Sequence, residues 1–201
     1  MFRAVLDTSV LVPGLQRDFL LQLAAERTYA PLWGTGILHE LDYVLERLDA
    51  MRSVTVADSK SRRQHLFSQM KRAFPGACMN SPKDGDYSYA LTDEFDGHVA
   101  HAAVIGKADA IVTNDRRAGF ENSPMLISAE VEILAPHVFA ANTVFAHTEG
   151  GLQALLAMAA RTGSPPMDPR ALLDRLATTY QMEEVAEMLA PRLGSSHQGH
   201  S

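Results

Sequence analysis

Short apolar runs alternate with helical patterns along the first two thirds of the chain. Aliphatic and β-branched residues at 2–6, 109–113 and 131–134 predict three buried strands. Apolar residues at helical spacing predict helices near 16–26, 36–49, 60–73 and 97–106. Residues 75–90 are rich in Pro, Gly and Asp and are typical of loops and turns. This order predicts an α/β fold around a central parallel sheet.

The pattern changes after Pro136. Helical patterns follow at 153–160, from Asp168 onward and at 183–193, and residues 162–166 form a hinge rich in Pro and Gly. We therefore expect an α/β domain at 1–140, a helical extension at 141–193 and a disordered tail at 194–201. The apolar stripes of the extension must pack on the α/β core, on a second copy of the chain or on a partner protein.

Three acidic residues stand where predicted strands end or a predicted helix begins. Asp7 directly follows the first strand, Asp115 follows the strand at 109–113, and Asp96 precedes the helix at 97–106. Capping of a helix would explain Asp7 or Asp96 alone. If the two strands are parallel, however, all three carboxylates converge on one edge of the sheet, where ligands bind in open α/β sheets. Such a cluster favours a site for a hard cation.

A fourth acid comes from the helix predicted at 36–49. Glu40 falls at the edge of the apolar stripe of this helix, whereas Asp42, Glu46 and Asp49 point further toward solvent. Its position alone also fits an ordinary amphipathic side chain that reaches water.

Four segments in a fixed order carry a resemblance to a known family. They are Leu-Asp-Thr-Ser-Val-Leu at 6–11, Glu40 on the second helix, Asp-Gly-His-Val-Ala at 96–100 and Val-Thr-Asn-Asp at 112–115. In these segments the chain resembles a PIN domain and, more narrowly, a VapC-type ribonuclease toxin of bacterial toxin–antitoxin pairs. The resemblance extends to 17–24, 31–33 and 131–136 and covers nearly all of residues 1–140.

The resemblance implies a structure, a reaction and partners. The implied fold is a three-layer α/β/α sandwich, and the C-terminal helices resemble an extension found on one branch of VapC-like toxins. The implied activity is endoribonucleolytic cleavage of RNA with Mg²⁺ or Mn²⁺ held by Asp7, Glu40, Asp96 and Asp115. A small DNA-binding antitoxin and a possible homodimer are the implied protein partners. Gly97 departs from the family, which often has Arg or another large polar residue after the third acid.

Other polar residues near these segments are possible supporting or substrate-binding groups. Asp93 could supply a ligand or compete with Asp96, and Arg116 and Arg117 adjoin Asp115. The remaining candidates are Thr8, Ser9, Arg17, Thr113 and Asn114.

Composition limits the alternatives. A net charge of −6 argues against indiscriminate nucleic-acid binding, although basic residues cluster at 60–63 and 71–72. Cys78 is the only cysteine, which excludes an internal disulfide and a Cys-rich zinc site. No apolar run is long enough for a membrane span and no signal peptide precedes the first strand, so we expect a cytoplasmic protein.

Two other functions compete with the ribonuclease on sequence grounds. The first is a catalytically weak PIN-fold module that binds protein or RNA. The second is a receiver-like phosphotransfer domain, which needs an acceptor Asp and a later strand-end Lys that we do not find. The complete set of four acids favours the ribonuclease, because a decayed site would be expected to lose at least one carboxylate.

Overall fold

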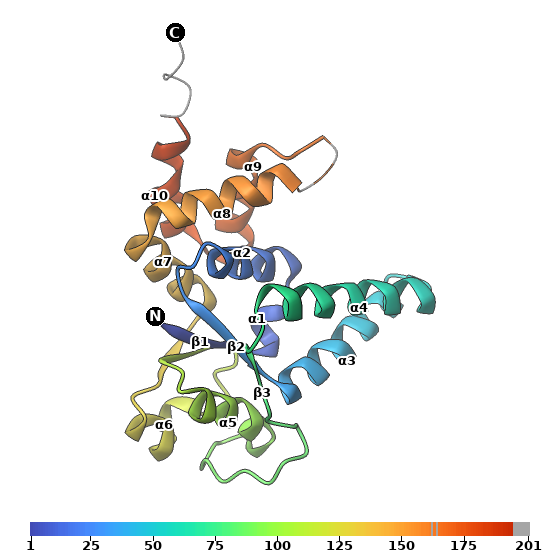
Figure 1. Ribbon diagram of the computed structural model, residues 1–201, viewed down its shortest axis with the longest axis vertical. Coiled ribbons are helices and arrows are strands. Elements are labelled where there is room, and N and C mark those ends of the chain that lie inside the picture. Colours follow the sequence, from blue (N-terminus) through green and yellow to red (C-terminus); the bar gives the residue numbers. More distant parts are fainter. Residues whose placement is uncertain (162, 164, 195–201) are drawn as a thin grey trace. The chain divides into compact units, whose positions relative to one another are not determined.

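The chain folds into two compact units. The computed structural model describes residues 1–161, 163 and 165–194 (Figure 1). The α/β unit comprises 2–12 and 30–134, and the helical unit comprises mainly 13–29 and 135–194. Of the tail predicted at 194–201, all but Gly194 lies outside the described residues, as do positions 162 and 164 of the predicted hinge.

A parallel sheet of five strands forms the centre of the α/β unit. The strands are β1 (Arg3–Leu6), β2 (Ala30–Gly34), β3 (Cys78–Met79), β4 (Ala110–Val112) and β5 (Glu132–Leu134). Their order is β3-β2-β1-β4-β5, and every neighbouring pair is parallel. The α/β class, the central parallel sheet and the additional C-terminal helices are therefore confirmed.

Strands β2 and β3 were not predicted from periodicity. β2 contains Pro31 and ends in Gly34, two residues that are uncommon inside strands. β3 has only two residues and lies within the loop predicted at 75–90. Both strands are held by pairing with distant neighbours, β1 for β2 and β2 for β3, which local patterns do not reveal.

Register places the candidate residues at one edge of the sheet. Leu6, the last residue of β1, pairs with Val112, the last residue of β4. The N–H of Asp7 donates to the carbonyl oxygen of Val112 over 3.1 Å. The residues that follow these two strands therefore emerge together, as expected for parallel neighbours.

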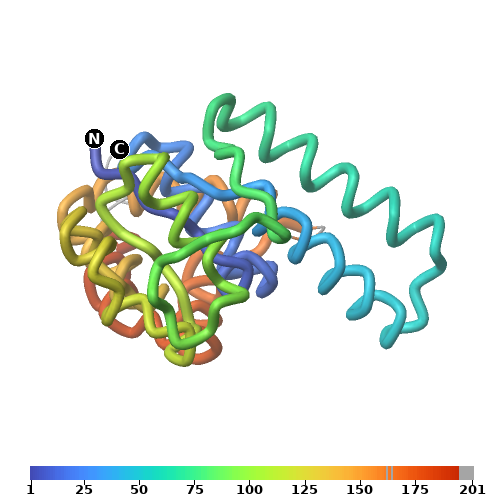
Figure 2. The backbone as a smooth tube through the Cα atoms, turned by 90° about the horizontal axis from the view of Figure 1, so that it is seen from below, coloured from blue at the N-terminus to red at the C-terminus, as the bar shows by residue number. Residues whose placement is uncertain are grey.

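Three helices of the α/β unit position the remaining candidates. α5 (Gly97–Gly106) contacts β1, β2 and β4, and α3 (Thr35–Met51) begins directly after β2. α4 (Val56–Ala73) runs beside α3, and Figure 2 shows the two helices as a long hairpin that extends away from the sheet. Buried Arg63 joins them through ion pairs with Asp42 and Glu46.

Shorter helical segments complete the α/β unit. α1 (Thr8–Leu11) follows β1 directly and contacts α3. The others are the 3₁₀ turns η1 (Glu94–Asp96) and η2 (Phe120–Asn122) and helix α6 (Pro124–Ser128).

The helical unit has its own apolar core. Its helices are α2 (Gly14–Ala25), α7 (Pro136–Ala146), α8 (Thr148–Arg161), α9 (Pro169–Tyr180) and α10 (Glu183–Leu193). The apolar stripes predicted in the extension are buried at Leu172, Leu176 and Leu189, and α9 and α10 pack on each other and on α8. These stripes are thus covered within the unit. In the described part of the chain, no helix is both long and apolar enough to span a membrane.

Candidate active site

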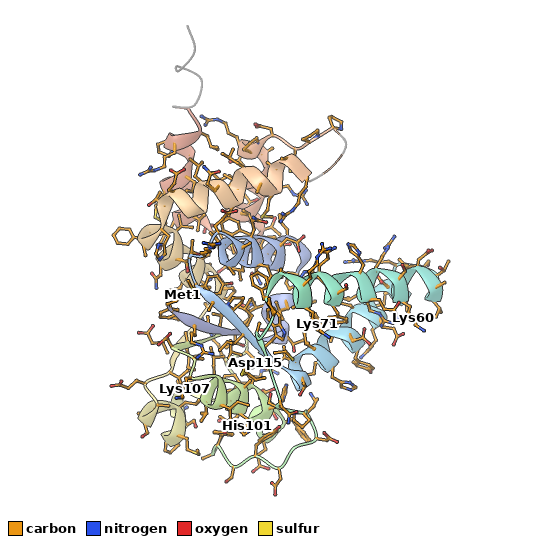
Figure 3. All side chains as sticks on the ribbon, viewed as in Figure 1. Met1, Lys60, Lys71, His101, Lys107 and Asp115 are labelled. Atoms are coloured by element: carbon orange, nitrogen blue, oxygen red, sulfur yellow. The ribbon has the colours of Figure 1, made fainter. Side chains whose placement is uncertain are left out.

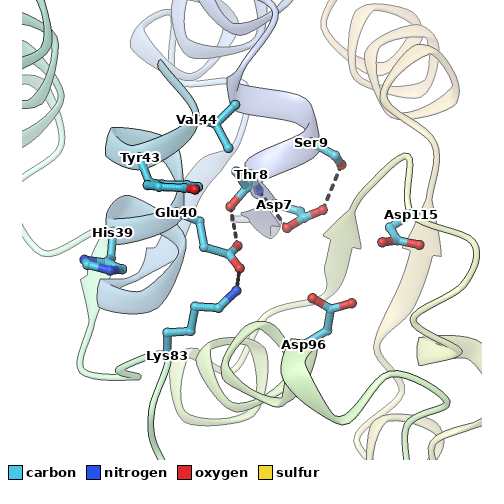
Figure 4. A pocket seen from close by; sticks show the side chains of 10 residues that line it. All are labelled: Asp7, Thr8, Ser9, His39, Glu40, Tyr43, Val44, Lys83, Asp96 and Asp115. Carbon is cyan, nitrogen blue, oxygen red and sulfur yellow. Dashed lines mark hydrogen bonds and ion pairs between the residues drawn. The ribbon is translucent and has the colours of Figure 1, made fainter. Parts of the chain in front are cut away.

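A pocket of about 590 Å³ lies in the α/β unit and brings the four predicted acids together (Figure 4). Its walls come from the ends of β1 and β4, the first turns of α3, the loop after β3 and the turn before α5. The lining residues are Asp7, Thr8, Ser9, His39, Glu40, Tyr43, Val44, Lys83, Asp96 and Asp115.

Asp7 is the most enclosed of the four acids, with 7% of its surface exposed. One carboxylate oxygen accepts a hydrogen bond of 2.6 Å from the N–H of Thr8 and thereby caps α1. The other accepts from the hydroxyls of Ser9 (2.8 Å) and Thr113 (2.7 Å). These three donors offset the cost of burying the carboxylate. Asp7 is thus both a helix cap and a pocket residue.

The same hydroxyl groups fix the chain that carries Asp115. The backbone N–H of Asp115 donates to Thr113 Oγ1 (2.9 Å), and that of Asn114 donates to Ser9 Oγ (3.0 Å). The Asp115 carboxylate accepts from the N–H of Arg117 over 2.7 Å, which closes a turn. Ser9 and Thr113 therefore connect the two strand ends and set the spacing of Asp7 and Asp115.

Asp96 faces these carboxylates from the start of α5 (Figure 4). It occupies the N-cap position, but its side chain makes no capping hydrogen bond, so capping does not explain it. Burial raises the pKa of Asp96 to about 6. The nearby carboxylates of Asp7, Asp93 and Asp115 contribute to this rise because they repel a further negative charge.

Glu40 has partners of its own. One oxygen forms an ion pair with Lys83, and the other accepts a hydrogen bond of 2.9 Å from the Thr8 hydroxyl. Nε2 of fully buried His98 lies 3.4 Å from the same Oε2, while His98 Nδ1 donates to the Phe95 carbonyl oxygen. Burial lowers the pKa of His98. Glu40 is therefore held more firmly than Asp96.

The sequence matches the family model of the PIN domain over residues 3–117, more than half of the chain. The chain belongs to the PIN-domain family. PIN domains are generally nucleases, enzymes that hydrolyse phosphodiester bonds. Searches among curated proteins and among solved structures gave no significant match.

The donor groups of this PIN domain suit a hard divalent cation. Asp7, Asp96 and Asp115 present only carboxylate oxygens to one pocket, and Mg²⁺ prefers a few such ligands together with retained waters. Burial and, to a smaller extent, the neighbouring carboxylates raise the pKa of Asp96, and a bound cation would offset both effects. Within the described residues, however, no three His, Cys, Asp or Glu side chains are arranged as a ready metal centre. The acids suit such an ion by their chemistry and share one pocket, and side-chain movement would have to bring their oxygens within coordinating distance.

The other predicted residues have different surroundings. Asp93 caps η1 by accepting from the Phe95 N–H, and it does not line the pocket. Arg116 is exposed and also lies outside the lining, and Asn114 contributes only its backbone N–H. Arg17 belongs to the helical unit, where it pairs with Asp18.

Four lining residues were absent from the sequence prediction: His39, Tyr43, Val44 and Lys83. The position of Glu40 could have indicated three of them. His39 is its neighbour in the sequence, and Tyr43 and Val44 lie about one helical turn further along α3. Lys83 lies in a loop without periodicity, so no sequence signal pointed to it.

Proposed function

We propose that this PIN-domain protein is a metal-dependent endoribonuclease. The observation that carries the proposal is the meeting of Asp7, Asp96 and Asp115 in one pocket, with the pKa of Asp96 raised in part by its neighbours. Carboxylates gathered in one partly buried pocket repel one another, and a bound cation would relieve this repulsion.

The chain's residues would hold Mg²⁺ or Mn²⁺ through these three carboxylates. Such an ion, when bound, lowers the pKa of a coordinated water and stabilises charge on the phosphate. Asp7 is the best-anchored ligand because three donors fix its orientation. Asp96 makes no capping hydrogen bond at the start of α5, so its carboxylate remains available to the ion.

RNA is the proposed substrate, and one feature of the pocket and one of helix α4 suit a single strand. Tyr43 lines the pocket, is 56% exposed and carries the Arg47 guanidinium 5.7 Å from its ring centre. Exposed aromatic rings beside cationic groups stack on unpaired bases. Helix α4 carries five of the chain's 18 Lys and Arg residues, and the four other than buried Arg63 give a local positive surface on a chain of net charge −6.

We further propose that the protein is the toxin of a VapC-like pair in the bacterial cytoplasm, countered by a small DNA-binding antitoxin and able to form a homodimer. The resemblance in the four acid-bearing segments supports this proposal. The buried stripes of the helical unit do not add to it, because they are covered by the unit's own helices.

The Asp7→Asn variant tests the nuclease proposal. The purified protein should cleave total RNA in Mg²⁺ and lose this activity in EDTA. Asp7→Asn should reduce the rate at least about 100-fold, equal to roughly 2.7 kcal/mol of transition-state stabilisation. Asp109→Asn, an acid outside the pocket lining, is the matched control and should cleave at the parental rate. Equal rates for the parent and Asp7→Asn would leave a binding module as the better interpretation.

Growth tests the toxin proposal separately. Expression of the parent chain should arrest bacterial growth, and Asp7→Asn should not. Co-expression of the neighbouring antitoxin gene should restore growth. Harmless expression of a chain that cleaves RNA in vitro would contradict the toxin role and leave the nuclease activity standing.

A further inference from the structure

Lys83 brings a positive charge into the acidic pocket. Its ammonium group pairs with Glu40 Oε1, and the Thr8 hydroxyl occupies Oε2, so both oxygens of this carboxylate have partners (Figure 4). The Glu40 side chain is 19% exposed and that of Lys83 is 39% exposed. No hydrogen bond or ion pair with a Lys or Arg side chain is found at Asp7, Asp96 or Asp115 among the described residues.

The loop that carries Lys83 is fastened to the first turn of α3. The N–H of Gly36 donates to the carbonyl oxygen of Ser81 (2.9 Å), and the N–H of Ser81 donates to Thr35 Oγ1 (3.1 Å). Position 40 lies one helical turn beyond position 36, so a lysine two residues after Ser81 reaches Glu40.

Gly36 allows this approach. A Cβ at position 36 would lie 2.6 Å from His98 Cδ2. It would also lie 2.9 Å from the backbone nitrogen of Lys83 and 2.9 Å from the carbonyl oxygen of Ser81. Any side chain here would push the loop away from α3. The close contact is therefore part of the fold and does not arise from a loosely placed surface lysine.

We infer that Lys83 is the resident cation of this pocket: it holds Glu40, and the site binds a single divalent ion on Asp7, Asp96 and Asp115. This inference rests on the proposed nuclease function and specifies how many ions that function uses. Glu40 then serves as the anchor of Lys83 and does not coordinate the ion.

Physical chemistry favours the tethered ammonium group over a second ion at Glu40. A divalent ion would have to break a half-buried ion pair, leave Lys83 without its partner and approach a positive charge. Mg²⁺ also loses its hydration waters reluctantly. The Lys83 ammonium group is part of the chain and already lies beside Glu40, so neutralising Glu40 needs no separate binding event.

Counting bound Mn²⁺ tests the inference. Equilibrium dialysis of the full chain should give one ion per protein, and Lys83→Met should give two because Glu40 is released. Lys83→Met combined with Glu40→Gln should return the count to one, and Lys83→Arg should keep it at one. Lys107→Met, which removes the same charge at the far end of α5, should also leave one. Cleavage should depend on Mg²⁺ hyperbolically in the parent and sigmoidally in Lys83→Met.

The outcomes separate the two proposals. Two ions on the parent chain, or one ion on a folded Lys83→Met variant, would overturn the role of Lys83 while the nuclease stands. No bound ion on any variant, together with absent cleavage, would overturn the nuclease proposal and this inference with it.

Discussion

Single side chains around the pocket support both the fold and the candidate site. Thr113 shows this most directly, because its hydroxyl donates to Asp7 and accepts from the backbone N–H of Asp115. It is only 6% exposed, so water cannot easily replace these bonds. The hydroxyl of one residue thus links the end of β1 to the end of β4.

Thr113→Val should destabilise the fold while keeping the side-chain shape. It removes a hydrogen bond to a carboxylate and leaves the N–H of Asp115 unpaired, which should lower the free energy of unfolding by about 1.5–3 kcal/mol. Urea denaturation in EDTA measures the change. Thr113→Ser keeps the hydroxyl and should lose much less, and equal losses in the two variants would show that the hydroxyl is not what matters.

Asp96 makes the metal-free fold sensitive to pH. Its pKa rises from 3.8 to about 6, so the folded protein binds a proton between these values that the unfolded chain has released. Stability from this group is therefore present at low pH and is lost as the pH rises through about 6.

Asp96→Asn removes the repulsion that appears above this pH. In EDTA at pH 7.5 the variant should melt at a higher temperature than the parent, and the difference should shrink toward pH 4. Mg²⁺ should reverse the order, because only the parent gains the full stabilisation of the bound ion. Glu94→Gln, an exposed neighbour outside the pocket lining, should show neither effect. A melting-temperature difference that does not change with pH would contradict the assignment.

At the scale of elements, α4 combines a packed face with an exposed basic surface, for which we propose a role in RNA binding. Buried Arg63 forms ion pairs with Asp42 and Glu46 of α3. The other basic residues of the helix are exposed: Lys60, Arg62, Lys71 and Arg72. Figure 3 shows Lys60 and Lys71 near opposite ends of the helix, so the positive surface runs along it.

Neutralising this surface should weaken RNA binding without changing the chemical step. Arg62→Gln with Arg72→Gln should raise KM for a long single-stranded RNA and leave kcat unchanged. The slope of log affinity against log salt should fall by up to about 0.7 per arginine that contacts a phosphate. Arg170→Gln with Arg175→Gln removes two exposed arginines from α9 and is the control. An equal KM rise in the control would indicate a general charge effect.

At the scale of the whole molecule, the pocket belongs to one unit, and the other unit has a separate apolar core. Every residue that lines the pocket belongs to the α/β unit. The helical unit has a core of its own, in which Leu155 of α8 is fully buried and the Tyr29 ring meets Phe139 edge-on at 4.8 Å. Residues 13–29 join this unit although they lie between β1 and β2 in the sequence.

A cavity in the helical unit should therefore lower stability and spare the metal site. Leu155→Ala should cost about 2–5 kcal/mol of unfolding free energy. Below its melting temperature the variant should bind Mn²⁺ with the parental affinity, measured by isothermal titration. Leu155→Met nearly conserves volume and should cost less. A tenfold loss of affinity in folded Leu155→Ala would show that the site depends on the helical unit.

The sequence by itself determined the elements with strong local periodicity and the order of the four acids. β1, β4 and α5 follow from apolar patterns, and parallel strands necessarily bring the residues after them to one edge. Once β1 and β4 are taken as parallel neighbours, the pattern of hydrophobic and polar positions groups Asp7, Asp96 and Asp115. The PIN-domain match covers these same elements.

Only the tertiary structure decided which partners these residues have. The Lys83–Glu40 pair depends on a loop seated against Gly36, and the high pKa of Asp96 depends on burial and on charges distant in sequence. The grouping of residues 13–29 with the C-terminal helices likewise follows from packing. Such contacts join segments far apart in the chain, and no local pattern of hydrophobic and polar positions encodes them.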